Sequence, residues 1–294
     1  MSEIVGVARR EGTVAALVRE LAAMLAAASI DDPGREARDI VAAVHEEPRF
    51  WAALHEHELV AAARAEAARS AARLRSAGAP FAYAVGLAAF RHLTLRVDER
   101  VLIPRQETEQ LVDEVLARET TGLAIDIGTG SGAIALALAS EGKFDRVIGT
   151  DVSRGALAVA ADNAMRLGAV LRANVELRQG ALFAPLAGIT ATVVVSNPPY
   201  IALDEAATLP ASVRDWEPPV ALFGTANGMA IISGIIREAP DVLQPGGLLA
   251  LELDSRRASL AAELALAHGR YRDVCVRLDL AGRERFLIAR RKDE

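Results

Sequence analysis

The stretch Leu123-Ala124-Ile125-Asp126-Ile127-Gly128-Thr129-Gly130-Ser131-Gly132 decides the fold, because an apolar strand runs directly into a glycine-rich loop. Residues 134–139 then continue as a helix. The Gly-x-Gly-x-Gly spacing differs from the Gly-x-Gly-x-x-Gly of dinucleotide-binding folds. Gly128 and Gly130 permit a tight turn and let a ligand approach the backbone closely. We therefore predict a cofactor loop here; a glycine turn made only for packing is the alternative.

Strand and helix patterns alternate on the C-terminal side of residue 120, which is typical of a parallel sheet covered by helices. The predicted strands are 123–127, 146–150, 175–177, 192–195 and 248–253, and the predicted helices are 134–139, 157–167 and 231–242. Residues 245–247, Pro-Gly-Gly, are predicted to turn. Residues 271–278 and 286–290 are predicted to close the sheet as a pair. The fold class is therefore α/β.

Asp151 indicates which ligand the glycine loop would hold. It ends the second predicted strand, close to the offset of about 20 residues at which an acidic side chain meets ribose hydroxyls. With no pyrophosphate to hold, the loop suits S-adenosylmethionine, whose amino-acid end would face the glycines and whose ribose would face Asp151. Asp162 and Asn163 are expected on an exposed helix face.

A second motif, Ser196-Asn197-Pro198-Pro199-Tyr200, follows the apolar run 193–195 at the end of a buried strand. Two consecutive prolines fix the backbone and remove two N–H donors. The Asn197 side-chain amide and the Pro198 carbonyl are then rigid acceptors beside the Tyr200 ring. Such a pair suits a planar amide or aromatic amine, whose two N–H groups it would bind. The alternative is a strand that simply ends in a rigid turn.

The N-terminal part of the chain has a different pattern. Residues 12–78 are predicted to be helical, with a long last helix over 58–77 that ends at Gly78. We predict a hairpin that consists of a strand over 93–97, a turn over 98–100 and a strand over 101–103. We therefore predict a helical substrate-recognition domain (1–78), a hairpin linker (79–103) and a catalytic domain (104–294).

Composition narrows the classes of function. The 294 residues carry a net charge of −6, so no overall basic footprint for nucleic acid is visible. Cys275 is the only cysteine, which favours a reducing, cytoplasmic setting. No apolar run reaches membrane-spanning length. His55-Glu56-His57 resembles a metal motif, but residues two apart on a helix point away from each other, so we predict no metal.

Taken together, these motifs resemble the HemK/PrmC group of protein-(glutamine-N5) methyltransferases. The resemblance runs from about residue 12 to residue 290, nearly the whole chain. It rests on Pro80-Phe81-Ala82-Tyr83-Ala84-Val85-Gly86, Phe90, residues 101–109, 126–132 and 197–200, Glu217-Pro218, Ala221-Leu222-Phe223-Gly224, Gly228 and Asp279-Leu280-Ala281-Gly282-Arg283. The Asn-Pro-Pro-Tyr motif is shared with other amine methyltransferases, whereas Ile-Pro-Arg-x-x-Thr-Glu and the helical block are more specific.

The resemblance implies a class I methyltransferase, with a Rossmann-like seven-stranded sheet behind a helical domain. It would use S-adenosylmethionine to methylate the glutamine of a Gly-Gly-Gln loop in peptide chain release factors. The implied catalytic residues are Asn197, Pro198 and Tyr200. The implied cofactor-binding residues are Asp126, Gly128, Thr129, Gly130, Gly132, Asp151, Ala181, Leu182 and Asn197. The implied substrate-binding residues are Phe90, Arg105, Thr108, Glu109, Pro199 and Glu217.

The chain departs from the family pattern at several places, namely Gln106, Ala181, Thr192, Trp216 and residues 254–257. Ala181 stands where an aspartate would face the adenine amine, which removes about 0.5–1.5 kcal/mol of hydrogen bonding. These departures keep two alternatives open. One is the same fold and cofactor with a small-molecule acceptor, and the other is a cofactor-binding regulator without catalysis. A nucleic-acid acceptor is disfavoured by the acidic balance.

Overall fold

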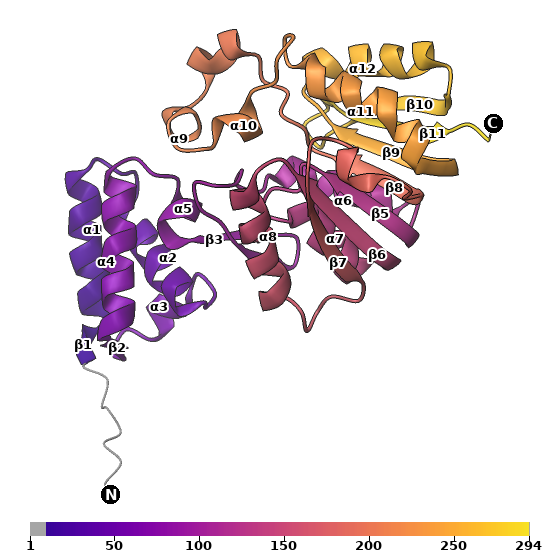
Figure 1. Cartoon of the computed structure of the whole chain (residues 1–294). Helices are drawn as coiled ribbons and strands as arrows, with labels where there is room; N and C mark the ends of the chain where they lie inside the picture. Colours follow the sequence, from indigo (N-terminus) through magenta and orange to yellow (C-terminus); the bar gives the residue numbers. More distant parts are fainter. Residues whose placement is uncertain (1–9, 294) are drawn as a thin grey trace, which may run out of the picture. The chain divides into compact units, whose positions relative to one another are not determined.

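The computed structural model describes residues 10–293, so the first nine residues of the predicted helical domain and Glu294 lie outside the described residues. The chain divides into two compact units. The first holds the chain up to Leu87 together with Ala211–Trp216, and the second holds Ala88–Pro210 and the chain from Glu217 onward. Figure 1 traces the elements of both along the sequence.

The first unit is a helical bundle with one small strand pair. Its elements are β1 (Arg10–Thr13), α1 (Val14–Ala27), α2 (Pro33–His45), α3 (Trp51–Leu54), β2 (Leu59–Ala61), α4 (Ala62–Ser76), α5 (Phe81–Val85) and the short α9 (Ala211–Arg214). The Thr13 and Asp32 side chains accept hydrogen bonds from the first turns of α1 and α2. Leu17, Leu21 and Leu25 of α1 pack into the core against α2 and α4.

One helix boundary in this unit differs from the prediction. The helix predicted over 58–77 begins only at Ala62, because Leu59–Ala61 extend as β2 and pair with β1. The predicted end is confirmed. Gly78 has a φ of +95°, and the N–H of Ala79 reaches back to the Leu74 carbonyl at 3.1 Å.

The predicted hairpin exists, but with a different partner strand. β4 (Leu93–Arg96) pairs with β3 (Leu87–Phe90), which precedes it, and residues 101–103 are not a strand. The reason is Asn163, which was expected to be exposed but is fully buried. Its side chain accepts from the Arg96 N–H at 2.7 Å and donates to the Arg96 carbonyl at 3.0 Å. These bonds occupy both backbone groups of Arg96, at the end of β4 nearest residues 101–103.

The second unit is built on a seven-stranded sheet with the order β10-β11-β9-β8-β5-β6-β7. The strands are β5 (Thr121–Ile127), β6 (Lys143–Asp151), β7 (Asn174–Gln179), β8 (Ala191–Ser196), β9 (Leu243–Glu252), β10 (Tyr271–Leu278) and β11 (Glu284–Arg291). Strands β5 to β9 pair in parallel, and β11 pairs antiparallel with β9 and β10. The predicted parallel sheet with a closing strand pair is confirmed.

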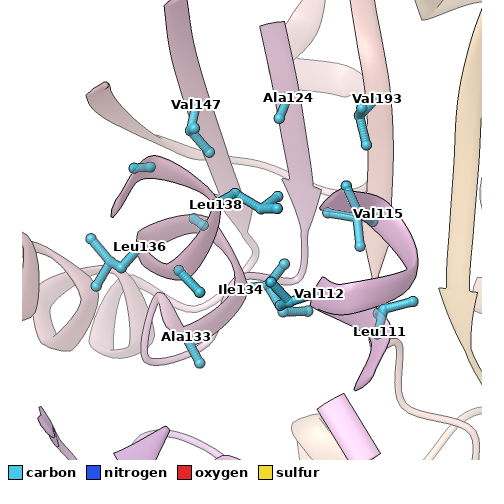
Figure 2. Close-up of a cluster of buried hydrophobic side chains, with 14 of the residues drawn as sticks. Leu111, Val112, Val115, Ala124, Ala133, Ile134, Leu136, Leu138, Val147 and Val193 are labelled. Atoms are coloured by element: carbon cyan, nitrogen blue, oxygen red, sulfur yellow. The ribbon is translucent and has the colours of Figure 1, made fainter. Parts of the chain in front are cut away.

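Helices cover both faces of this sheet. Its helices are α6 (Gln106–Leu116), α7 (Ala133–Glu141), α8 (Arg154–Arg166), α10 (Pro219–Leu222), α11 (Met229–Val242) and α12 (Ser255–His268), with 3-10 turns η1 (Ala184–Leu186) and η2 (Leu203–Thr208). Along β8, Val193 and Val195 face the core under α6 and α7, and Val194 faces the core under α11 and α12. Figure 2 shows Val193 in the first of these clusters. Both faces are therefore apolar, as parallel sheets require.

Two features of the second unit differ from expectation. Helix α12 was not predicted, because its buried stripe consists of the small residues Ala258, Ala261 and Ala265, which give a weak periodic signal. The predicted turn at 245–247 lies inside β9, where the register with β8 shifts between Ala191 and Val193. Among the described residues, no helix is long and apolar enough to cross a membrane.

We expect the Leu138→Ala variant to lower the free energy of unfolding by about 2–5 kcal/mol, because it leaves a cavity between α7 and the sheet. Leu138 is 0% exposed and lies at the centre of the cluster in Figure 2. Leu280→Ala is the matched control, since that side chain is 92% exposed. Urea unfolding of both variants measures the difference. Equal losses of stability would contradict this account of the core.

Candidate functional site

A pocket opens at the carboxyl ends of β5, β6 and β8, where the loops that follow these strands meet. This is the edge of an open α/β sheet at which ligands bind. Among the predicted site residues, those that line the pocket are Arg105, Thr108, Gly128, Thr129, Gly130, Asp151, Ala181, Leu182, Asn197, Pro198 and Pro199. The structure therefore brings most of the predicted cofactor set together with the Asn-Pro-Pro motif.

The glycine loop turns tightly between β5 and α7. The N–H groups of Gly128 and Thr129 both donate to the Thr150 carbonyl at 2.8 Å, which ties the loop to the end of β6. Gly128 and Gly130 have φ values of +74° and +55°, in the left-handed region that favours glycine. A Cβ atom at either position would meet no atom within 4 Å. The loop therefore presents bare backbone to open space in the pocket.

Asp126 lies beneath the loop rather than in the pocket lining. It is 0% exposed, and its Oδ2 atom accepts from the Thr129 hydroxyl at 2.6 Å and from the Ala135 N–H at 3.2 Å. Its Oδ1 atom is buried without a hydrogen-bond partner. Burial raises the pKa of Asp126 to about 7, although the bonds from Thr129 and Ala135 lower it. In this structure Asp126 holds the loop and the start of α7.

Asp151 ends β6 at the pocket wall, as predicted. Its Oδ2 atom accepts from the Gly130 N–H at 3.0 Å, and its Oδ1 atom accepts from the Ser153 N–H at 2.8 Å. A carboxylate offers about four acceptor positions, so each oxygen retains room for a hydroxyl donor. The two backbone bonds fix the carboxylate in orientation, which suits it to a diol.

The Asn-Pro-Pro-Tyr motif follows directly from β8. The Asn197 side chain donates from Nδ2 to the Thr108 Oγ1 atom on α6 at 3.0 Å. Its Oδ1 atom is then the one left to accept an N–H group from a bound molecule. Burial raises the pKa of the Tyr200 hydroxyl to about 12, so it stays protonated at neutral pH. The motif therefore offers acceptors and no base.

An ion pair with one buried partner holds part of the pocket wall. Glu217, which is 3% exposed, accepts from Arg105 at 2.5 Å and from the Ile103 N–H at 3.3 Å. Arg105 lines the pocket, whereas Glu217 lies behind it. The pair therefore fixes a cationic side chain at the pocket wall.

The remaining predicted site residues, Phe90, Glu109, Gly132 and Tyr200, do not line the pocket. Phe90 is fully buried in the core under α6 and α7. Glu109 accepts from the Arg91 N–H at 2.9 Å. Gly132 begins α7 with a φ of +83°, and Tyr200 packs against the core under α11 and α12. Direct roles for these residues in binding stay predictions.

Two polar residues near the site were not predicted. Glu252 ends β9 and is 1% exposed; burial raises its pKa to about 7, although the Thr108 hydroxyl lowers it. Arg257, buried at the start of α12, donates to the Asn227 carbonyl at 2.8 Å and to Glu205 at 3.0 Å. Arg257 thereby ties down the segment that follows Tyr200. A charged residue ending an otherwise apolar strand was the available signal for Glu252.

The His55-Glu56-His57 run lies in the first unit, where the His55 side chain contacts Trp51. The His55 ring stacks on Trp51 at 4.6 Å, and its Nδ1 atom lies 2.7 Å from the Trp51 carbonyl. Over residues 10–293, no group of three or more His, Cys, Asp or Glu side chains is placed to hold a metal ion.

The fold and the pocket define a methyltransferase. Residues 106–211 match the family described as "Methyltransferase small domain". A solved methyltransferase from Pyrococcus furiosus superposes with a TM-score of 0.53 at 22% identity, over 70% of this chain and 92% of that chain, and so shares the fold.

More specific likenesses cover nearly the whole chain. Residues 16–86 match the "PrmC N-terminal domain". A release factor glutamine methyltransferase from Moorella thermoacetica is 43% identical over 92% of this chain and 95% of its own length. Another from Cereibacter sphaeroides is 41% identical over 90% of this chain and 94% of its own length. The chain belongs to the family of release factor glutamine methyltransferases, as the sequence motifs predicted.

Gly128→Ala should weaken binding of S-adenosylmethionine about tenfold or more, because the new methyl group enters the pocket. Gly188→Ala is a matched control, since both glycines have a φ of +74° and neither Cβ would meet an atom within 4 Å. Both variants carry the same backbone strain, but Gly188 lies outside the pocket lining. Titration calorimetry compares the two; equal affinities would contradict a ligand seated on the loop.

Asp126→Asn should gain stability relative to the native chain as pH rises. The folded-state pKa of about 7 lies above the ordinary 3.8, so native Asp126 loses stability between about pH 4 and pH 7, whereas asparagine does not titrate. We expect the difference in unfolding free energy to change by on the order of 2 kcal/mol between pH 5 and pH 8. Urea unfolding without cofactor measures it, with exposed Asp145→Asn as control. A pH-independent difference would show that the carboxyl is already ionised at pH 5.

Proposed function

We propose that this chain transfers a methyl group from S-adenosylmethionine to the side-chain amide nitrogen of the glutamine in the Gly-Gly-Gln loop of a peptide chain release factor. The observation that carries the proposal is the position of the Asn197 side-chain amide in the lining of the glycine-loop pocket. The Asn197 Nδ2 atom donates to the Thr108 Oγ1 atom at 3.0 Å, which holds the amide in place. The names of relatives that are 43% and 41% identical support the same acceptor.

The residues of the pocket fit the cofactor. Gly128 and Gly130 leave a cradle that a Cβ atom would fill, which suits the amino-acid end of the molecule. Asp151 is oriented for the ribose hydroxyls by two backbone N–H groups. Ala181 and Leu182 line the pocket after β7 and would contact the adenine. The chemistry that S-adenosylmethionine supplies when bound is an electrophilic methyl group on a sulfonium.

On the acceptor side, the chain supplies orientation rather than acid–base chemistry. The Asn197 Oδ1 atom and the Pro198 carbonyl would accept the two N–H groups of the glutamine amide, which points its nitrogen lone pair along the line of transfer. Two hydrogen bonds from the N–H groups also enrich that nitrogen in electron density. Tyr200 stays protonated and would pack beside the amide. The amide proton can leave after transfer, so no strong base is needed.

The first unit is proposed to recognise the acceptor protein. Its match to the PrmC N-terminal domain supports this role, as do the exposed apolar side chains of Phe50 and Leu54 at α3, which are 67% and 73% exposed. We propose a cytoplasmic location, where release factors act. The predicted absence of a nucleic-acid acceptor stays a prediction.

The experiment is transfer of labelled methyl from S-adenosylmethionine to a purified release factor, to the same factor with its Gly-Gly-Gln glutamine replaced, and to a short Gly-Gly-Gln peptide. We expect label on the intact factor, none on the replaced factor, and a higher KM for the peptide, because the peptide lacks the surface that the first unit would bind. No label despite intact cofactor binding would favour a small-molecule acceptor instead.

Asn197→Ala tests the proposed orientation of the acceptor. Loss of one of its two hydrogen bonds should lower kcat on the order of 100-fold, while cofactor affinity changes far less. Asn174→Ala, an exposed asparagine on β7, is the control and should keep full turnover. Turnover that survives Asn197→Ala would overturn this mechanism without touching the family assignment.

A further inference from the structure

One buried guanidinium bonds to the segments on both sides of α10. Arg257, at the start of α12, is 6% exposed and does not line the pocket. Its Nε atom donates to the Asn227 carbonyl at 2.8 Å. Its Nη1 and Nη2 atoms donate to Asp254 at 2.6 Å and to Glu205 at 3.0 Å. Because arginine presents its donors in a rigid fork, this side chain joins η2 and the loop before α11 to the start of α12.

Glu205 carries this contact to the chain that follows Tyr200. Its Oε2 atom accepts from Arg257 and also from the Ala202 N–H at 3.0 Å. Gly228 leaves no room for a side chain, because a Cβ atom there would collide with the Tyr200 carbonyl oxygen and with the Arg257 Nε atom. The guanidinium and the backbone at both positions are therefore in close contact.

The chain after the Asn-Pro-Pro-Tyr motif also pairs with the chain around α10. The Ile201 N–H donates to the Leu222 carbonyl at 3.1 Å, and the Gly224 N–H donates to the Ile201 carbonyl at 2.9 Å. Residues of both stretches line the pocket, namely Pro198, Pro199, Val220 and Ala221. The contacts of Arg257 therefore hold together two stretches of the pocket wall.

The other end of the motif is held by β8 and α6. The Ser196 hydroxyl donates to the Ile127 carbonyl at 2.6 Å, and the Asn197 Nδ2 atom donates to the Thr108 Oγ1 atom at 3.0 Å. The two prolines between these contacts and Tyr200 restrict the backbone. A short, stiff segment that is fixed at both ends also fixes the Pro198 carbonyl, which lies in its middle.

We propose that Arg257 is a positioning residue, which holds the far end of the motif and so keeps the Pro198 carbonyl in place to accept an N–H group of the acceptor amide. The cofactor side is held separately, because the N–H groups of Gly128 and Thr129 donate to the Thr150 carbonyl at 2.8 Å. Loss of Arg257 should therefore impair the acceptor step and leave cofactor binding intact. This inference rests on the proposed function only for the kinetic part of its test.

Hydrogen exchange followed by NMR tests the contacts of Arg257 without any acceptor. Arg257→Met keeps most of the bulk and removes every donor. The amide protons of Ile201 and Gly224 should then exchange about tenfold faster, because the segment loses a charge-assisted hydrogen bond. Those of Gly128 and Thr129 should exchange as in the native chain. The result stands even where the native chain transfers no label to a release factor, so it separates this inference from the proposed function.

The kinetic test uses a release factor as acceptor. Arg257→Met should lower kcat about tenfold, while the KM for the release factor changes less and the Kd for S-adenosylmethionine stays within about twofold. Arg257→Lys keeps the charge but has one nitrogen, so its kcat should fall between the two. Arg256→Met is the matched control and should keep the native kcat. Arg256 is the preceding residue and also pairs with Glu205, but its side chain is 73% exposed.

Four outcomes would overturn the proposal. The first is native exchange at Ile201 and Gly224 in Arg257→Met, and the second is an equal acceleration at Gly128 and Thr129, which would show a general loss of stability. The third is a native kcat despite faster exchange at Ile201 and Gly224. The fourth is a loss of cofactor affinity as large as the loss of kcat, because the role of Arg257 would then not be specific to the acceptor.

Discussion

The site depends on one buried carboxylate. Asp126 sits at the end of the central strand β5 and holds the Thr129 hydroxyl and the Ala135 N–H with a single oxygen. Burial removes that carboxyl from water and opposes its ionisation, which raises its pKa to about 7. The Asp126 Oδ2 atom thereby joins β5 to the glycine loop and to the first turn of α7. The open backbone at Gly128 and Gly130 can keep its shape because this bond and the Thr150 carbonyl hold it.

A second set of contacts holds the segment that follows the Asn-Pro-Pro-Tyr motif. Arg257 donates to Glu205 and to the Asn227 carbonyl, which lie on either side of α10. Gly228 must be glycine, since a Cβ atom there would lie 1.9 Å from the Tyr200 carbonyl oxygen. Arg257 belongs to residues 254–257, which the sequence predicted to depart from the family pattern. In this structure that segment therefore supplies a clamp for the backbone near Tyr200.

The sequence was informative where periodicity is strong. The strands of the parallel sheet are apolar on both faces, so the sheet was predictable. Loops with glycine or proline follow β5 and β8, so it was also predictable that Asp151 and Asn197 line one pocket at the carboxyl edge of the sheet. Contacts between distant side chains were not. Asn163 takes the backbone groups at the end of β4 and changes the hairpin, and nothing local in the sequence announces that pairing. Alanine-rich α12 was missed because small residues mark a buried face weakly.

The same limit explains why Glu252 escaped notice. The charged residue at the end of an otherwise apolar run was a signal, but the strand alone does not say which side chains of other elements surround that carboxylate. Buried polar groups are retained where they fix an orientation that apolar packing cannot distinguish. An asparagine amide is nearly symmetric in shape, so packing alone cannot set which end faces the pocket. Only a hydrogen-bond partner can do so, and in this structure that partner is the Thr108 Oγ1 atom, which accepts from the Asn197 Nδ2 atom at 3.0 Å.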